Sequence, residues 1–332
     1  MKHANVALFV PNNGCPHACS FCNQRTITGK AAQPTPDDVV RAVEVARKSG
    51  SLRGETAEIA FFGGSFTAVE RTYMLSLLEA AVPYVRDGTV SGIRISTRPD
   101  AVGEEVLSLL KEYGVTTIEL GAQSMDNAVL SLNGRGHTAE QIVDASGRIR
   151  ARGFTLGLQM MTGLPGDSDA GAWETARRIA ELHPQCVRIY PAIVLSGTQL
   201  GESFCRGEYR PPSLEETVAL CARLLDFFED RNIPVIRLGL HASPELERDR
   251  LAGPWHPAFR ELCESRRMLL KFTDFLSRAN RKKGNITVRV SPRDVSAATG
   301  QNKCNLHALE ALGYPAKILP DPGAERRSFQ IE

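Results

Sequence analysis

The 332-residue sequence lacks any apolar run long enough to cross a lipid bilayer, which would need about 20 consecutive apolar residues. Its first residues, MKHANVALFVPNNG, contain too short an apolar stretch for a signal peptide and no cleavage site of small residues. We therefore expect a cytoplasmic chain with no membrane partner. In that compartment, clustered cysteines bind metal more often than they form disulfides.

An excess of one charge sign is also lacking, because 40 Lys and Arg face 38 Asp and Glu. The net charge of +2 therefore indicates no class of partner. The charges are unevenly distributed, however: residues 266–293 carry +8 and the rest of the chain carries −6. This basic segment suits either a solvated helix face and turn or a polyanion-binding surface. Its only acidic residue is Asp274, and its nine cations are Arg266, Arg267, Lys271, Arg278, Arg281, Lys282, Lys283, Arg289 and Arg293.

Internal repeats and low-complexity tracts are absent too, and short apolar runs instead alternate with longer helical patterns. A helix is expected over 35–50, where Thr35 can cap, Pro36 suits the first helical position and Gly50 suits the stop. Further helices are expected over 103–114 and 213–232. Six strands are expected at 5–10, 58–62, 92–96, 116–121, 155–161 and 187–192.

Six strand–helix units predict an α/β fold whose parallel sheet is joined by right-handed crossovers. A closed eight-unit barrel needs about 250 residues, so six units favour a partial (β/α)6, TIM-like barrel over residues 1–240. Its active site is expected at the carboxyl ends of the strands. A further strand is expected at 234–240. Residues 241–332 then predict a small α+β cap domain that covers the barrel mouth and selects substrate.

Three of the eight cysteines, Cys15, Cys19 and Cys22, lie together in CPHACSFC, directly after the first predicted strand. Structural zinc usually takes four ligands, often from paired C-x2-C units, and no matching pair follows downstream. His17 would have to converge with three sulfurs from inside the same loop. Three unligated buried cysteines would be the other alternative, but the loop's Gly, Pro and Asn residues argue against an apolar setting.

A cluster of four irons and four sulfides fits three cysteines best. Thiolates are soft ligands that can hold three of the irons. The fourth iron then keeps an open position, as catalytic metal sites do. A ligand with both an amine and a carboxylate can chelate that iron.

The C-x3-C-x2-C pattern, with Phe21 before its last cysteine, looks like the radical S-adenosylmethionine (SAM) superfamily. The stretch FFGGSFT (61–67) resembles the glycine motif of that superfamily, whose backbone binds the methionine amino group. The resemblance assigns this contact to Gly63, Gly64 and Ser65. Taken alone, a double glycine also suits a tight strand-to-loop turn.

Further motifs resemble the radical domain of the elongator catalytic-subunit family, which modifies wobble uridine in transfer RNA. A more distant similarity is to oxygen-independent coproporphyrinogen oxidase. The resemblance covers about residues 4–240 and places Gln123, Arg135 and Gln159 in the SAM pocket. It implies that Arg135 pairs with the cofactor carboxylate and that the two glutamines bond ribose hydroxyls. The motifs are ISTRPD (95–100), ELGAQS (119–124), GRGHT (134–138), MMTGLPGD (160–167) and YPAIVLSGTQL (190–200).

The sequence departs from these families in three respects. Both families usually have aspartate where Gln159 stands. The cysteine spacing is nearer to that of coproporphyrinogen oxidase than to that of the elongator family. The residues after Leu240 contain no recognisable acetyl-coenzyme A motif, whereas the elongator family carries an acetyltransferase domain.

The resemblance implies an enzyme that cleaves SAM reductively at a 4Fe–4S cluster. The 5′-deoxyadenosyl radical so formed would abstract hydrogen from a substrate, with flavodoxin or ferredoxin as electron donor. Transfer RNA is one candidate substrate, with Arg281, Lys282 and Lys283 as candidate RNA contacts. A small molecule such as a porphyrin precursor is a second candidate substrate. A third interpretation is that the chain is a non-catalytic binding protein that contains the cluster. No side chain is predicted to act as a catalytic acid or base.

The remaining candidate residues have less specific signals. Tyr190 and Lys303 are candidate substrate contacts, whereas structural hydrogen bonding is expected of His137 and His241. Five scattered cysteines are expected to be ordinary buried or surface residues: Cys186, Cys205, Cys221, Cys263 and Cys304.

Overall fold

The computed structural model describes residues 4–11, 15, 19–23, 26–27, 32–50, 52 and 57–332. Contacts divide the chain into two compact units. The barrel unit comprises residues 1–212 and 231–254, and the C-terminal unit comprises 213–230 and 255–332. This division differs from the predicted boundary at residue 240, because the helix over 213–230 packs against a helix of the C-terminal unit.

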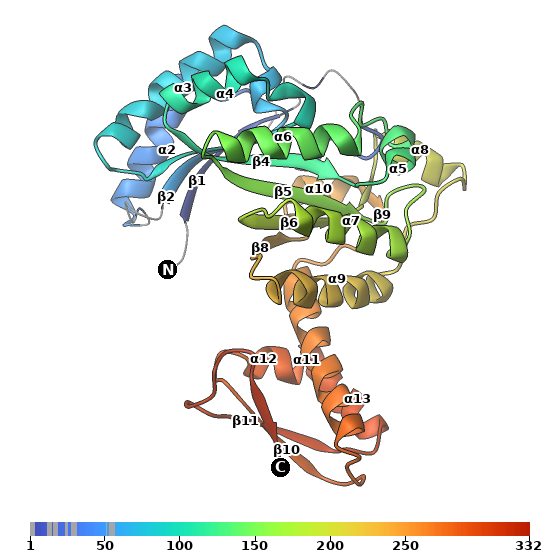
Figure 1. Ribbon diagram of the computed structural model, residues 1–332. Coiled ribbons are helices and arrows are strands. Elements are labelled where there is room, and N and C mark those ends of the chain that lie inside the picture. The colour runs from blue at the N-terminus through green and yellow to red at the C-terminus, as the bar shows by residue number, and fades with distance from the viewer. Residues whose placement is uncertain are drawn as a thin grey trace. The chain divides into compact units, whose positions relative to one another are not determined.

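A parallel seven-stranded sheet forms the barrel unit, in the order β1-β2-β3-β4-β5-β6-β8 (Figure 1). This arrangement confirms the predicted α/β partial barrel, and β8 adds a seventh strand. Strand β1 at one edge and β8 at the other do not pair within the described residues, so the barrel is open along that side. The strands are β1 (Ala4–Val10), β2 (Ala57–Gly63), β3 (Gly92–Thr97), β4 (Val115–Gln123), β5 (Thr155–Thr162), β6 (Cys186–Pro191) and β8 (Val235–Leu238).

Helices connect successive strands, and Figure 1 shows α6 running along one face of the sheet beside β4. Helix α2 begins as predicted, with a capping box between Thr35 and Asp38. The short strands β7 (Val194–Leu195) and β9 (Arg250–Ala252) pair antiparallel. The helices of this unit are α2 (Pro36–Lys48), α3 (Arg71–Arg86), α4 (Glu104–Glu112), α5 (Asn127–Leu132), α6 (Ala139–Ala151), α7 (Asp169–Glu181), α8 (Gln199–Cys205) and α10 (Pro244–Asp249).

Side chains alternate in character along the strands. Ile93 and Ile95 of β3 are fully buried, whereas Arg94 and Ser96, which point to the opposite face, line a pocket inside the barrel. The outward apolar side chains therefore form the core beneath the helices. The inward polar side chains furnish the interior of the partial barrel.

The C-terminal unit contains helices and a three-stranded sheet in the order β11-β10-β12. Its core packs Met268 and Phe272 of α11 against Ile286 and Val288 of β10. Its elements are α9 (Leu214–Glu229), α11 (Phe259–Arg278), β10 (Ile286–Val290), α12 (Val295–Thr299), α13 (Cys304–Ala311), β11 (Ala316–Pro320) and β12 (Phe329–Ile331).

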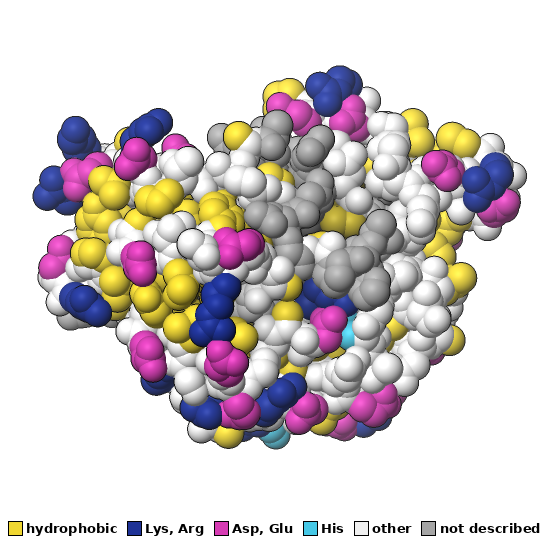
Figure 2. All heavy atoms as spheres, turned by 90° about the horizontal axis from the view of Figure 1, so that it is seen from above, with side chains coloured by type: hydrophobic (Ala, Val, Ile, Leu, Met, Phe, Trp, Pro, Cys, Tyr) yellow, Lys and Arg dark blue, Asp and Glu magenta, His cyan; other side chains and the backbone are white. Residues whose placement is uncertain are grey.

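Both charge signs are present over the surface. On the face that Figure 2 shows, Lys and Arg side chains are interspersed with Asp and Glu. Exposed ion pairs such as Arg71–Glu105 and Arg152–Glu104 join helices of the barrel unit. Among the described residues, no helix combines the length and the apolar composition that crossing a membrane requires.

Candidate active site inside the partial barrel

The cysteine loop follows β1 at the carboxyl edge of the sheet, where catalytic residues were predicted. Cys19 and Cys22 belong to one turn, in which the Cys22 N–H donates to the Cys19 carbonyl over 3.1 Å. Cys15 is exposed, while Cys19 and Cys22 are half-buried. His17, the nitrogen ligand considered for zinc, lies outside the described residues. Within the described part of the chain, no three His, Cys, Asp or Glu side chains converge on one metal position.

Hydrogen bonds from two directions hold this turn in place. The Ser20 hydroxyl donates to Asn133 Oδ1 over 2.7 Å, and the Ser20 N–H donates to the Asn133 carbonyl over 3.1 Å. Asn133 is fully buried at the end of α5, and its amide also donates to the carbonyl of Pro165 in the loop after β5. The Leu200 N–H of α8 donates to the Ser20 carbonyl. The cysteine turn is thus tied directly to α5 and α8, and through Asn133 to the loop after β5.

Arg135 joins the cysteine turn to β4. Its Nη1 lies 3.0 Å from Cys19 Sγ, and its Nη2 donates to the Gly121 carbonyl over 2.8 Å. The side chain is buried, and within the described residues its Nε has no hydrogen-bond partner. A Cβ at Gly121 would lie 3.3 Å from Nη2, so the glycine of ELGAQS leaves the guanidinium room. Arg135 therefore places a positive charge beside a cysteine of the loop.

The double glycine after β2 lies against the end of β1. Gly63 has a φ of +113°, and a Cβ there would lie 2.8 Å from the Val10 carbonyl oxygen. The Gly64 N–H donates to that same oxygen over 2.8 Å. This close approach by itself accounts for a glycine at position 63.

Ser65, which follows the double glycine, is buried, and its hydroxyl shares a 2.8 Å hydrogen bond with that of Thr97. Desolvation raises the pKa of the Cys15 thiol, although the Ser65 backbone N–H and the charges of Arg98 and Arg135 oppose this rise. Ser65 of the glycine motif therefore lies beside the first cysteine of the loop.

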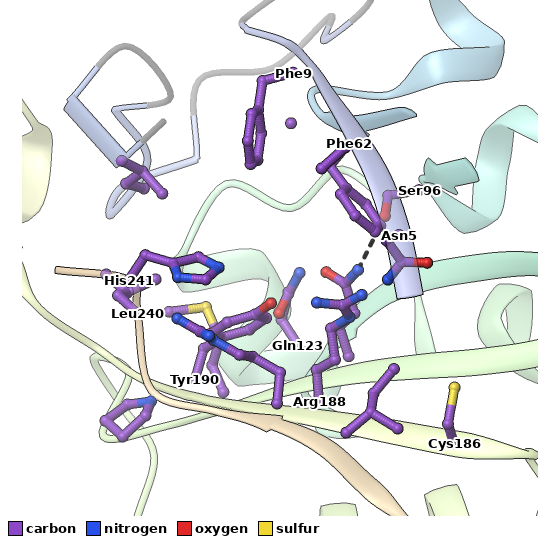
Figure 3. A pocket seen from close by; sticks show the side chains of 18 of the residues that line it. Asn5, Phe9, Phe62, Ser96, Gln123, Cys186, Arg188, Tyr190, Leu240 and His241 are labelled. Carbon is purple, nitrogen blue, oxygen red and sulfur yellow. Dashed lines mark hydrogen bonds between the residues drawn. The ribbon is translucent and has the colours of Figure 1, made fainter. Parts of the chain in front are cut away.

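Gln123 and Gln159 both reach the interior pocket. Gln123 ends β4 with a φ of +66°, and its buried Oε1 has no hydrogen-bond partner within the described residues. The Gln159 amide nitrogen donates to Glu119 Oε2 over 3.0 Å and to Ser96 Oγ over 3.3 Å, the dashed line in Figure 3. Gln123 Oε1 thus has no donor among the described residues, whereas the Gln159 amide bonds to the protein through its nitrogen.

The pocket itself has a volume of about 930 Å³ and extends from β1 to β8 inside the barrel. Gly63, Gln123 and Gln159 line it together with Cys22, so it reaches the cysteine turn. Figure 3 shows Phe9 across the pocket from His241 and Tyr190. A volume of this size is typical of sites for small molecules and cofactors. Three of the six predicted SAM-site residues therefore line the pocket, whereas Gly64, Ser65 and Arg135 are not part of its lining.

Four charged residues in and behind the pocket wall were not predicted. Arg94 Nε pairs with Glu58 over 2.7 Å, and Arg94 Nη1 pairs with Glu119 over 2.8 Å. Arg188 Nε pairs with the other oxygen of Glu119 over 2.5 Å. Burial raises the pKa of Glu119, but Arg188 and Arg94 outweigh burial and hold it below its usual value. This charge ladder, formed by Glu58, Arg94, Glu119 and Arg188, has no net charge.

The other residues that the sequence analysis named lie in different parts of the structure. Tyr190 and His241 line the pocket, whereas Lys303 lies in the C-terminal unit at the start of α13. Burial and the adjacent Arg135 lower the pKa of His137 to about 4, so its ring is neutral at pH 7.

The five scattered cysteines form no cluster within the described residues. Cys186 lines the pocket, and burial raises the pKa of its thiol to about 11. Cys221 and Cys263 are buried in the C-terminal unit, whereas Cys205 and Cys304 are exposed.

Much of the basic segment is neutralised by acidic residues that lie elsewhere in the C-terminal unit. Arg267 is buried between Asp226 and Glu229, and Arg289 pairs with Glu332. By contrast, Arg281, Lys282 and Lys283, in the turn between α11 and β10, have no ion pair with any described residue. The candidate RNA contacts are therefore among the cations of the segment that no described carboxylate pairs with, as are Arg266 and Arg293.

The chain belongs to the radical SAM superfamily, whose family model matches residues 9–179. A second model, the radical SAM C-terminal domain, matches residues 184–269. The chain is therefore an enzyme of this superfamily, with a 4Fe–4S cluster and SAM as its cofactors.

Comparison with curated proteins finds similarity to an uncharacterized protein of Methanocaldococcus jannaschii, 30% identical over 73% of this chain and 77% of that protein. A tRNA uridine(34) acetyltransferase of the same organism is 34% identical over 38% of this chain, but the match spans only 24% of that enzyme. The solved Elp3 structure from Methanocaldococcus infernus superposes with a TM-score of 0.60 at 22% identity, over 84% of this chain and 63% of that one. This structural likeness shows the fold alone.

Proposed function

We propose that this enzyme cleaves SAM reductively and abstracts a hydrogen atom from a uridine of transfer RNA. The observation that carries the SAM site is the placement of Arg135 against Cys19, beside a pocket that Gln123 and Gln159 line. The substrate class is supported by the relatives named as tRNA uridine(34) acetyltransferases.

Cys15, Cys19 and Cys22 are the proposed ligands of the cluster. Their donor set suits it, because three thiols leave one iron open to SAM and Arg135 already directs a charged donor at Cys19 Sγ. When bound, the cluster supplies the electron that splits SAM into methionine and a 5′-deoxyadenosyl radical. A flavodoxin or ferredoxin is the proposed source of that electron.

The proposed contacts to SAM differ in the chemical group that each of them binds. Backbone groups of Gly63, Gly64 and Ser65 bind the methionine amino group, and Arg135 binds the methionine carboxylate through a charge-assisted bond. Its buried Nε, which lacks a partner among the described residues, is a donor available for that purpose.

Gln123 and Gln159 then accept hydrogen bonds from ribose hydroxyls. The contact with Glu119 explains how Gln159 can accept such a hydrogen bond at a position where relatives have aspartate. A carboxylate only accepts hydrogen bonds, so Glu119 takes the amide nitrogen of Gln159 and leaves the amide oxygen for the ligand. At this position a correctly oriented glutamine therefore supplies the same acceptor as an aspartate.

Arg281, Lys282 and Lys283 are the proposed contacts to the RNA backbone. They are three cations in consecutive positions without ion pairs among the described residues, and phosphate contacts favour such accessible cations. The matches to two of these acetyltransferases span 24% and 52% of their length, so the acetyl-transfer reaction is not part of this proposal.

Deuterium transfer tests the function directly. The anaerobically reconstituted enzyme is supplied with dithionite, SAM and transfer RNA in which the uridines carry deuterium. Because the radical would take its hydrogen from uridine, 5′-deoxyadenosine should gain one deuterium, detectable by mass spectrometry. Unlabelled 5′-deoxyadenosine formed at the same rate with and without RNA would refute the RNA substrate while leaving SAM cleavage intact.

A further inference from the structure

The end of the chain contains a strand–helix–helix–strand motif that lies outside both matched family models, the second of which ends at residue 269. Strand β10 leads into α12, then into the loop of residues 300–303, α13 and β11 (Figure 1). Strands β10 and β11 are parallel neighbours. Both helices pack on one face of this sheet, because Ala298 of α12 and Leu309 of α13 share a core with Val288 of β10. The loop between the helices is therefore supported by a small core of its own.

The loop of residues 300–303 has the sequence GQNK and a backbone that favours glycine. Gly300, Asn302 and Lys303 have φ angles of +77°, +51° and +61°. A Cβ at Gly300 would lie 3.1 Å from the backbone nitrogen of Asn305, so glycine lets the loop approach the first turn of α13 closely. Lysine is uncommon in the left-handed conformation. Lys303 therefore adds a positive charge at a position where glycine would be the unstrained residue.

Buried polar side chains hold this loop from beneath. Asn305 is buried, and its amide donates to the Ser265 carbonyl of α11 over 2.9 Å and to the Ala297 carbonyl of α12 over 3.0 Å. The start of α13 is thus fixed against two other helices. Ser265 is also buried, and its hydroxyl has no hydrogen-bond partner within the described residues. A Cβ at Gly300 would lie 2.9 Å from that hydroxyl oxygen, so an unpartnered polar group is directed at the loop.

The outer side of the loop suits an anion. Gln301, Asn302 and Lys303 are exposed, and neither the loop nor the first turn of α13 contains an acidic residue. Lys303 has no ion pair with any described residue. The positive end of the α13 dipole lies at the same place. The charge, the helix dipole and the fixed backbone therefore all favour a phosphate group over the loop.

Cations lie at both ends of α13. Lys303 is at its start, and a Cβ at Gly313, just past its end, would lie 2.7 Å from Lys283 Cδ. The Gly284 N–H donates to the Gly313 carbonyl over 3.0 Å, so the turn after α11 is joined to this end of the helix. A helix of 8 residues is about 12 Å long. The loop and the candidate RNA contacts at 281–283 are therefore separated by about one short helix.

We infer that the loop of residues 300–303, with α12 and α13, binds the backbone of a single-stranded segment of RNA. The inference rests on the proposed function, because that proposal supplies RNA as the ligand. RNA-binding K-homology modules clamp the backbone of about four nucleotides with a G-x-x-G loop, whereas duplex RNA is recognised across its minor groove. Here Lys303 occupies the place of the second glycine in a left-handed conformation. It adds a cation at the point where the strand crosses the loop.

Binding of two RNAs by the full-length chain tests the site without turnover. Polyuridylate is the single-stranded probe, its duplex with polyadenylate is the paired probe, and filter binding measures both affinities. The wild-type enzyme should prefer the single strand. Gln301→Asp combined with Asn302→Asp adds two negative charges to the loop, and aspartate tolerates the left-handed conformation of Asn302. This variant should bind polyuridylate about tenfold more weakly or worse, because a charge-assisted contact is lost, and should bind the duplex nearly as before.

Two further variants separate the loop from general charge effects. Gln141→Asp combined with Asn232→Asp adds the same charge at exposed positions of the barrel unit, and Asn232 is likewise left-handed, with a φ of +56°. This control should keep both wild-type affinities. Lys303→Gly relieves the backbone without removing the clamp. It should keep the preference for the single strand while the slope of log affinity against log salt falls by about 0.7, the value for one phosphate contact.

Equal affinity of the wild-type enzyme for the two RNAs would overturn the site whatever the variants do. Undiminished binding of polyuridylate by the loop variant would overturn it as well. The two proposals fail separately. Deuterium transfer from transfer RNA, together with undiminished binding by the loop variant, would remove only the loop site. Single-strand binding that depends on the loop, without deuterium transfer, would remove only the uridine reaction.

Discussion

Arg135 Nη1 lies 3.0 Å from Cys19 Sγ, although the two residues are 116 positions apart in the sequence. This contact brings a residue of the GRGHT motif to the cysteine loop and places a fixed positive charge where a cluster and a carboxylate are proposed to bind. The same guanidinium is anchored to β4 through the Gly121 carbonyl. Its position is therefore set by the sheet as well as by the loop.

Arg135→Ala should weaken SAM binding by about 1.5–3 kcal/mol, because it removes a charge-assisted hydrogen bond from a buried site. Equilibrium dialysis with reconstituted protein measures the change. Arg152→Ala, which removes an exposed arginine of the same unit, serves as the control and should bind SAM normally. Identical affinities for wild type and Arg135→Ala would remove Arg135 from the cofactor site.

Glu119→Gln should destabilise the fold by about 3–5 kcal/mol, because it leaves two buried guanidinium groups without their shared carboxylate. Denaturant unfolding of the apoprotein measures this loss. Glu105→Gln, which breaks only the exposed pair with Arg71, should cost less than about 1 kcal/mol. A similar small loss for both variants would show that the charge ladder does not stabilise the barrel.

Asp167 provides a pH-dependent prediction. Burial raises the pKa of its carboxyl to about 6, and Asp126 and Asp169 add to the rise. In the unfolded chain this group ionises near pH 3.8. Its raised pKa in the folded state therefore lowers the free energy of unfolding increasingly from pH 4 to pH 6, and by the full amount above pH 6. Asp167→Asn should therefore raise stability at pH 7 by about 1–2 kcal/mol, after discounting for partial exposure, and by almost nothing at pH 4.

Thermal unfolding of wild type and Asp167→Asn at the two pH values measures that difference. Asp169→Asn, at the exposed neighbour, is the matched control and should show little change at either pH. An equal gain for Asp167→Asn at pH 4 and pH 7 would show that the effect does not come from ionisation.

Replacing Arg281, Lys282 and Lys283 by alanine should weaken binding to transfer RNA and make it less dependent on salt. Each lost phosphate contact should reduce the slope of log affinity against log salt by about 0.7–0.9. Filter binding across a salt series measures both effects. A control with alanine at the exposed residues Lys48, Arg86 and Arg210 should keep the wild-type slope. Unchanged affinity and slope in the first variant would mean that these cations do not contact RNA.

The strands were predictable because apolar residues alternate or cluster over short runs between clear helix signals. The predicted 92–96 and 155–161, for example, are observed as Gly92–Thr97 and Thr155–Thr162. The division into units was harder to predict, because the helix over 213–230 looks like any other crossover helix. Only its packing against α11, distant in sequence, assigns it to the C-terminal unit.

The charges were the part of the site that sequence reasoning missed. Glu58, Arg94, Glu119 and Arg188 stand singly in apolar strands, and this isolation was a signal that they point into the barrel. A single sequence does not show which residues 25 to 69 positions apart form ion pairs, so the charge ladder could not be predicted. The +8 of residues 266–293 was misleading for the same reason, because Asp226, Glu229 and Glu332 lie outside that window.

Cluster chemistry at the three loop cysteines is tested most directly by 5′-deoxyadenosine formation in anaerobically reconstituted protein with dithionite and SAM. The wild-type protein should hold about four irons per chain and release 5′-deoxyadenosine. A control with alanine at the exposed Cys205 and Cys304 should behave in the same way. Replacement of Cys15, Cys19 and Cys22 by alanine should abolish both the iron and the product. Retention of iron and of 5′-deoxyadenosine formation by that triple variant would contradict the account.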